Sequence, residues 1–140
     1  MLKRQTLTSL FLLVAVAAMP PVALPQRPCS RSCRDHPRLA APCFTVRGRM
    51  SFVNGAPSVR VWRVGTKRIL GVSQGQDDEY YDPEYCDLPS DIYAKLSWES
   101  DLFGDFVLCP FERSQPGVMQ RVCVDGGKNL TVRPRSSSRW

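Results

Sequence analysis

Six cysteines constrain the fold of this chain more than any other feature of its sequence. An even number of cysteines in an exported chain indicates up to three disulfide bonds, and six cysteines allow fifteen connectivities. The cysteines are Cys29, Cys33, Cys43, Cys86, Cys109 and Cys123. We therefore expect a compact domain in which irregular segments are fastened by cross-links.

The N-terminal residues indicate that the chain is exported. Lys3 and Arg4 form a short basic segment, and an uncharged apolar run of about ten residues follows it. Such a run is too short to span a bilayer but suits the hydrophobic part of a signal peptide. Residues 1–23 are therefore predicted to be a signal peptide, cleaved after Ala17 or Ala23, and the mature protein to be secreted or periplasmic.

The charge of the mature chain argues against a nucleic-acid partner. The whole chain carries 19 Lys and Arg against 13 Asp and Glu, a formal charge of +6, which falls to +4 when Lys3 and Arg4 leave with the signal peptide. Nucleic-acid binding requires many basic residues on one face. After removal of the signal peptide we expect no transmembrane segment, no cofactor and, as partner, an extracellular or envelope protein.

Residues 24–43 are predicted to form an irregular arm. Six of the twelve prolines lie within residues 20–42, and proline fixes φ and removes a backbone donor, which disfavours helix and central strand. The only histidine, His36, lies in this arm and is expected to face solvent. Because nucleophilic catalysis usually needs a histidine as base, no catalytic residue is assigned.

The arm also has the ligand types of a zinc site. Cys29, Cys33, His36 and Cys43 lie within fifteen residues of one another, which is a plausible ligand number for structural zinc. An oxidising compartment favours disulfides over thiolate ligands. We therefore predict disulfides for these cysteines and no metal site.

From Phe44 onward the sequence predicts an all-β domain, which we place at residues 44–133 and follow with a polar, basic tail at 134–140. Apolar and polar residues alternate along 44–52, and Asn54-Gly55 is a strong turn signal. Further strands are expected at 58–64, 67–72, 105–110, 118–124 and 128–132, and residues 92–98 form either a strand or a short helical turn. Six or seven strands at this spacing indicate a single small β-sandwich.

Two short motifs lie within this domain. The first is Val46-x-Gly48, followed by Asn54-Gly55-Ala56-Pro57 and Val59-x-Val61. The second runs from Ser100 to Phe106 and fits the pattern Ser/Thr-Asp-x-x-Gly-x-Phe. Together they resemble transthyretin-like and carboxypeptidase-regulatory-like β-sandwich domains, over roughly residues 44–109.

The resemblance implies a fold and a local geometry but no activity, because proteins that share this sandwich have unrelated roles. It implies that Asp101 and Gly104 make a tight turn before a strand whose aromatic residue, Phe106, enters the core. Two further runs, Val64-Gly65-Thr66-Lys67-Arg68 and Phe103-Gly104-Asp105-Phe106, are similar to those of a group of small, uncharacterised secreted bacterial proteins, which supports export.

Residues 73–91 form the longest stretch without a strand pattern, and they are acidic and rich in tyrosine. Loops of this length are uncommon and are either functional or mobile. Tyrosine offers a large contact area at low entropic cost, so we take part of this loop as a possible contact surface: Asp77, Asp78, Glu79, Tyr80, Tyr81 and Tyr85. Its carboxylates suit Ca²⁺ but lack the regular spacing of a calcium loop, and whether the loop binds an ion stays open.

One disulfide is predicted from hairpin geometry. The segments that contain Cys109 and Cys123 form a predicted hairpin whose midpoint, residue 116, lies in a Pro-Gly turn. The two cysteines then face each other across neighbouring strands and are predicted to bond. By elimination, the three arm cysteines share two bonds with Cys86. A bulge that shifts the register by one residue is the alternative.

These observations favour a non-enzymatic secreted module that binds a ligand or has a structural role at the cell envelope or outside it. The alternative is a secreted enzyme inhibitor or a carboxylate-based hydrolase. A hydrolase of that kind needs two acids that face one cleft, whereas the acids here are concentrated in one loop.

Overall fold

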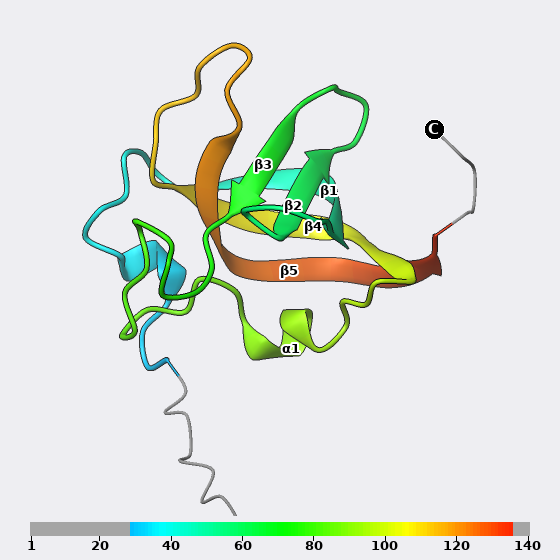
Figure 1. Cartoon of the computed structure of the whole chain (residues 1–140), viewed down its shortest axis with the longest axis horizontal. Helices are drawn as coiled ribbons and strands as arrows, with labels where there is room; N and C mark the ends of the chain where they lie inside the picture. The colour runs from blue at the N-terminus through cyan, green and yellow to red at the C-terminus, as the bar shows by residue number, and fades with distance from the viewer. Residues whose placement is uncertain (1–28, 136–140) are drawn as a thin grey trace, which may run out of the picture.

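The computed structural model describes residues 29–135 and consists mainly of β-strands (Figure 1). The strands are β1 (Phe44–Phe52), β2 (Val59–Arg63), β3 (Ile69–Val72), β4 (Ser100–Pro110) and β5 (Gln120–Pro134). A 3-10 turn, η1 (Cys33–Asp35), lies in the arm, and a single helical turn, α1 (Ser90–Tyr93), lies between β3 and β4. The all-β prediction is confirmed, and the predicted signal peptide lies outside the described residues.

The five strands close into one barrel in the order β1-β2-β3-β5-β4. Neighbours are antiparallel except β3 and β5, which run parallel. A closed barrel of five strands in this order has the architecture of the OB-fold, a five-stranded Greek-key barrel. The core therefore lies inside one curved sheet, and not between two sheets as in the predicted sandwich.

Two of the predicted strands account for the difference in strand number. Segments 118–124 and 128–132 belong to the same long strand, β5, which continues through Asp125, Gly126 and Gly127. Residues 92–98 supply part of α1 and the segment that leads into β4.

Alternation along the strands builds the core. In β1 the buried positions are Val46, Gly48 and Met50, and in β4 they alternate from Leu102 to Leu108. The interior is tightly filled: a Cβ added at Gly48 would lie only 2.7 Å from the Cγ1 atom of Val61. The core side chains are Val46, Met50, Val59, Val61, Leu70, Val72, Ile92, Leu102, Phe106, Leu108, Val122 and Val124.

The second sequence motif has a role other than the one that the resemblance implies. Ser100 to Phe106 lies within β4, so Asp101 and Gly104 make no turn. Gly104 faces the barrel interior, where an added Cβ would lie 2.5 Å from Cδ2 of Leu130 on β5. The glycine is therefore explained by close packing between two strands. Phe106 is fully buried in the core, as expected.

All six cysteines form disulfides, but the predicted bond between Cys109 and Cys123 is wrong. These two residues are opposed in the register of β4 and β5, as the hairpin predicts. Each bonds instead to the arm, and the pairs are Cys33–Cys123, Cys43–Cys109 and Cys29–Cys86. Cys86 therefore pairs with an arm cysteine, as expected.

Disulfide geometry explains why the opposed cysteines take other partners. Directly opposed residues hold their Cβ atoms about 4.5–5.5 Å apart, whereas a disulfide requires about 3.5–4.5 Å. The arm is not part of the sheet and can approach each sulfur separately. Both strands of the hairpin are thereby cross-linked to the arm.

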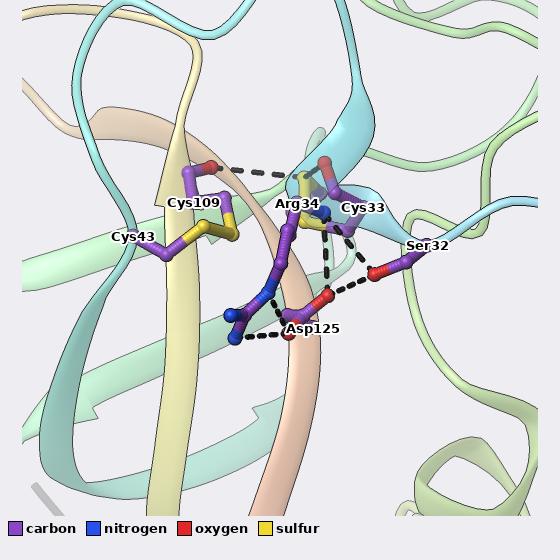
Figure 2. Close-up of polar contacts among 7 residues, drawn as sticks. Ser32, Cys33, Arg34, Cys43, Cys109 and Asp125 are labelled. Carbon is purple, nitrogen blue, oxygen red and sulfur yellow. Dashed lines mark hydrogen bonds and ion pairs between the residues drawn. A yellow bond between two sulfur atoms is a disulfide. The ribbon is translucent and has the colours of Figure 1, made fainter.

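The arm covers a second, smaller apolar cluster outside the barrel. Its buried members are Cys33, Cys109, Phe111 and Cys123. Beside it, the carboxylate of Asp125 on β5 accepts hydrogen bonds from the Ser32 hydroxyl and from the Arg34 backbone N–H and guanidinium (Figure 2). Burial alone would raise the pKa of Asp125, but these hydrogen bonds and the charge of Arg34 together lower it.

His36 is buried, contrary to the expectation that it faces solvent. Only 4% of its surface is exposed. Its ring centroid lies 4.7 Å from that of Tyr85 and 4.9 Å from that of Phe111. Burial lowers the pKa of His36, and its Nδ1 accepts a hydrogen bond from the backbone N–H of Arg38. The histidine therefore packs the arm against Tyr85 and Phe111.

Candidate functional site

The loop at residues 73–91 borders a pocket of about 230 Å³ between the loop and α1. In Figure 1 this loop and the arm lie on the same side of the barrel. The pocket wall includes the Cys29–Cys86 disulfide. The wall residues that matter for its chemistry are Gln74, Tyr81, Tyr85, Asp87, Leu88 and Tyr93.

Hydrogen bonds to the arm and the barrel hold the loop in place. Arg31 in the arm forms an isolated parallel bridge with Tyr85. The backbone N–H of Cys86 donates a hydrogen bond to the backbone carbonyl of Arg31 over 2.9 Å. The backbone carbonyl of Asp87 accepts from the N–H of Val124 on β5 over 2.8 Å. The part of the pocket wall at residues 85–87 is thus anchored to both the arm and β5.

Two of the six predicted contact residues are used inside the molecule. The side chain of Asp78 is only 6% exposed, and it pairs with Arg121 and accepts from the Ser73 hydroxyl. The ring of Tyr80 stacks on Phe111, with centroids 4.7 Å apart and planes 6° apart. Neither side chain is arranged to meet a partner.

The other four predicted contact residues are divided between the surface and the pocket. Asp77 and Glu79 are exposed on the loop. Tyr81 and Tyr85 both line the pocket, although only 8% of Tyr85 is exposed. Tyr85 also accepts a hydrogen bond on its hydroxyl from the Arg31 guanidinium over 2.9 Å. The structure therefore brings two of the predicted tyrosines together in one cavity.

Asp87 is the residue of this site that sequence reasoning does not find. One of its carboxyl oxygens, Oδ1, is buried and has no hydrogen-bond partner among the described residues. Burial, with a contribution from the charge of Asp82, raises the pKa of Asp87 to about 7. In the sequence it is one of many acids in the loop, and nothing distinguishes it. An unpaired acid with a perturbed pKa in a pocket is a candidate functional group.

An exposed aromatic patch adjoins the pocket. Trp98 and Tyr93 are each 52% exposed, and Phe52 contacts both. The Phe52 ring stacks on Trp98, with centroids 5.3 Å apart, and meets Tyr93 edge-on at 5.9 Å. Because Tyr93 also lines the pocket, pocket and patch form one surface. Sequence patterning favours a core position for Trp98, and this expectation is wrong because the residue follows α1 outside the barrel.

This combination of groups suits a cation. Aromatic rings attract cations through the negative charge of their faces, and a buried carboxyl without a partner is stabilised in its ionised form by a nearby positive charge. Asp87 is the only carboxyl among the described lining residues. The pocket thus offers one carboxyl and two tyrosines, Tyr81 and Tyr93, to a single positive group. The ring of the third tyrosine, Tyr85, already has the Arg31 guanidinium 5.6 Å from its centroid.

The possible metal ligands lie elsewhere. In the part of the chain described, Cys33, Cys109 and Cys123 bring their sulfur atoms within 4.8 Å of one another. Two disulfides that lie side by side account for this proximity. Sulfur in a disulfide is not the thiolate that zinc requires, so these residues make a cross-linked core and not a metal centre.

Comparison with known proteins gives no relative. No family model, curated protein or solved structure matches this chain. Within residues 29–135 no helix has the length and apolar character needed to cross a membrane. The resemblance to transthyretin-like domains stays a prediction, and the function has to be argued from the site itself.

Proposed function

We propose that this chain is a secreted, non-catalytic binding module whose pocket receives a lysine-type side chain from an extracellular or envelope protein. The observation that carries this proposal is the carboxyl of Asp87, which lacks a hydrogen-bond partner on its buried oxygen and lies in a pocket with three tyrosines. A buried polar group without a partner calls for an explanation. A positive group in the pocket supplies one.

The size of the pocket favours a side chain over a small-molecule ligand. Its volume of about 230 Å³ is below the roughly 300–1,000 Å³ typical of pockets for drug-sized ligands. A lysine side chain is narrow and ends in a compact ammonium group.

The aromatic patch supports a protein as the source of this side chain. Trp98 and Tyr93 expose about half of their surface directly beside the pocket. Tryptophan and tyrosine are the residues that most often dominate the energy of protein interfaces. We infer that the patch packs against the backbone and neighbouring residues of the partner while its lysine enters the pocket.

The cross-links support a location outside the cytoplasm. Three disulfides are compatible with an extracellular or periplasmic protein. The basic and apolar N-terminal segment supports export by the general secretory route.

The chemistry of the described residues supports a binding role over catalysis. His36 in the arm is buried, and every cysteine is in a disulfide. A hydrolase with two carboxylates needs both acids at one cleft, and only Asp87 lines this pocket among the residues described. We therefore favour a binding module over the carboxylate-based hydrolase.

A peptide titration tests the proposal. The ¹⁵N-labelled mature protein is titrated with acetyl-Gly-Gly-Lys-Gly-Gly-amide and with the same peptide carrying Nε-acetyl-lysine, and NMR shifts near Tyr81 and Tyr93 are followed. We expect saturable shifts with the lysine peptide. We expect at least about tenfold weaker binding for the acetylated peptide and for Asp87→Asn, since a lost charge contact of about 1.4 kcal/mol changes Kd tenfold.

Asp77→Asn is the matched control, because it removes one charge from an exposed position of the same loop. It should leave the affinity within about twofold of that of the wild type. Equal shifts with both peptides, or unchanged binding by Asp87→Asn, would overturn the proposal.

A further inference from the structure

The last described residue, Arg135, is fixed beside the aromatic patch. Its backbone N–H donates a hydrogen bond to the carbonyl of Glu99 over 2.8 Å, and its guanidinium donates to the backbone carbonyl of Phe52 over 2.6 Å. The same guanidinium pairs with the carboxylate of Asp101 at 2.8 Å. Figure 1 shows this end of β5 beside the start of β4, with which it is paired. Because Phe52 belongs to the patch and Glu99 follows Trp98, the chain leaves the barrel at the edge of the patch.

The aromatic patch leaves apolar surface and a negative charge without a partner in residues 29–135. Trp98 and Tyr93 are each about half exposed, although Phe52 packs against both. The side chain of Glu99, next to Trp98 in the chain, is exposed and forms no ion pair within the described residues. The patch is therefore complementary to a segment that carries both an aromatic ring and a cation.

Residues 136–140, which lie outside the described residues, have this composition. Their sequence is Ser-Ser-Ser-Arg-Trp, so a cation, Arg139, stands directly before a tryptophan, Trp140. A tryptophan ring buries a large area against other aromatic rings. A guanidinium can pair with a carboxylate or lie over an aromatic face. Both residue types are thus matched to groups that the patch exposes.

The patch lies within reach of this segment. An extended chain covers at most about 3.3–3.6 Å per residue, so five residues reach about 17 Å from Arg135. The Arg135 guanidinium already contacts the backbone of Phe52. The ring of Phe52 has its centroid 5.3 Å from that of Trp98 and 5.9 Å from that of Tyr93. Five residues therefore suffice to bring Trp140 onto these rings.

We propose that residues 136–140 fold back onto the aromatic patch of the same chain, with the ring of Trp140 against Trp98 and the guanidinium of Arg139 at Glu99. A short tether gives the segment an effective concentration in the millimolar range. An intrinsic affinity in that range is therefore enough for the segment to occupy the patch, whereas a second copy of the chain at micromolar concentration does not compete.

This contact regulates the proposed binding site. A partner protein has to displace residues 136–140 before it packs against Trp98 and Tyr93, so the segment lowers the affinity of the module for its partner. This consequence rests on the proposed function. The docking itself does not, because it depends only on the patch and on the place where the chain leaves β5.

NMR of the mature chain through Trp140 tests the inference. We expect NOEs between the rings of Trp140 and Trp98 in the wild type. The indole N–H resonance of Trp98 should move in Trp140→Ala, because the neighbouring ring is lost, and should stay in place in the matched control Ser137→Ala. In a chain that ends at Arg135, the peptide Ser-Ser-Ser-Arg-Trp should move this resonance back toward its wild-type position, with a Kd in the millimolar range. The peptide Ser-Ser-Ser-Arg-Ala should not.

Two results would overturn the inference. One is a Trp98 resonance at the same position in the wild type and in Trp140→Ala. The other is NOEs that arise only between copies in a mixture of labelled and unlabelled protein, since the occupant is then a second chain. Binding of acetyl-Gly-Gly-Lys-Gly-Gly-amide is a separate readout. If that peptide fails to bind while the NOEs are present, the proposed function fails and the docking stands.

Discussion

Replacing Asp87 by asparagine should change how stability depends on pH. The pKa of this carboxyl is raised from 3.8 to about 7 in the folded protein, first by burial and then by the charge of Asp82. A raised carboxyl pKa means that the folded state binds the proton more tightly than the unfolded state. Its contribution to stability is therefore fully present below pH 3.8 and is lost as the pH rises from there to about 7.

The size of the effect follows from the two pKa values. At about 1.4 kcal/mol per pKa unit, the full difference corresponds to an upper limit of about 4 kcal/mol. Between pH 5 and pH 8, proton linkage at this carboxyl changes the free energy of unfolding by about 2–3 kcal/mol. Because water reaches part of the side chain, we expect a change of about 1–3 kcal/mol. Asparagine cannot ionise, so Asp87→Asn should escape this loss.

Urea unfolding at pH 5 and pH 8, with the disulfides intact, measures the difference. The free energy of unfolding of the wild type should fall by about 1–3 kcal/mol relative to that of Asp87→Asn over this interval. His36 is present in both proteins, so its contribution to the comparison cancels. Asp77→Asn should follow the wild type. If Asp87→Asn also follows the wild type, Asp87 is not a buried, unpaired acid.

Three further substitutions test the way the arm and loop are held. Asp125→Asn should destabilise the protein by about 1–3 kcal/mol in urea unfolding at pH 7. Because the pKa of Asp125 is lowered in the folded protein, this difference from the wild type should shrink as the pH falls through about 4. A difference at pH 3 as large as that at pH 7 would contradict this reasoning. Replacing Cys33 and Cys123 together by serine removes a disulfide with a sequence separation of 90. The free energy of unfolding should fall by about 4–5 kcal/mol in the chain-entropy model. A fall below about 1 kcal/mol in the same assay argues against the pairing. Asp78→Asn should destabilise by more than about 1 kcal/mol because it breaks a mostly buried ion pair, whereas Asp77→Asn should be neutral within about 0.5 kcal/mol.

The strands could be predicted from the sequence, but their closure into a barrel could not. Alternation along β1 identifies which residues point inward, and it does so correctly for Val46 and Met50. The buried position of Phe106 follows instead from the resemblance of its motif. Alternation does not say which strand lies beside which, and the parallel contact between β3 and β5 depends on packing across the whole chain. The Asp125-Gly126-Gly127 segment has the composition of a turn. It nevertheless continues β5, because β4 pairs with the residues before it and after it.

The disulfides illustrate the same limit. The opposed positions of Cys109 and Cys123 follow correctly from hairpin symmetry. Their partners depend on where the arm crosses the barrel, which no local pattern records. The sequence likewise identifies the loop that borders the pocket, but Asp78 and Asp87 differ only in their surroundings: the first pairs with Arg121, and the second has no partner on its buried oxygen among the residues described.

The pKa of Asp87, measured with and without a lysine peptide, tests the proposed binding site most directly. The carboxyl carbon is followed by ¹³C NMR across pH 3 to 9 in the free protein and in the presence of acetyl-Gly-Gly-Lys-Gly-Gly-amide. We predict a pKa near 7 in the free protein and a clear decrease when the peptide is bound, because an ammonium group stabilises the ionised carboxylate. An ordinary pKa in the free protein, or a raised pKa that the peptide leaves unchanged, would contradict the proposal that this pocket receives a cation.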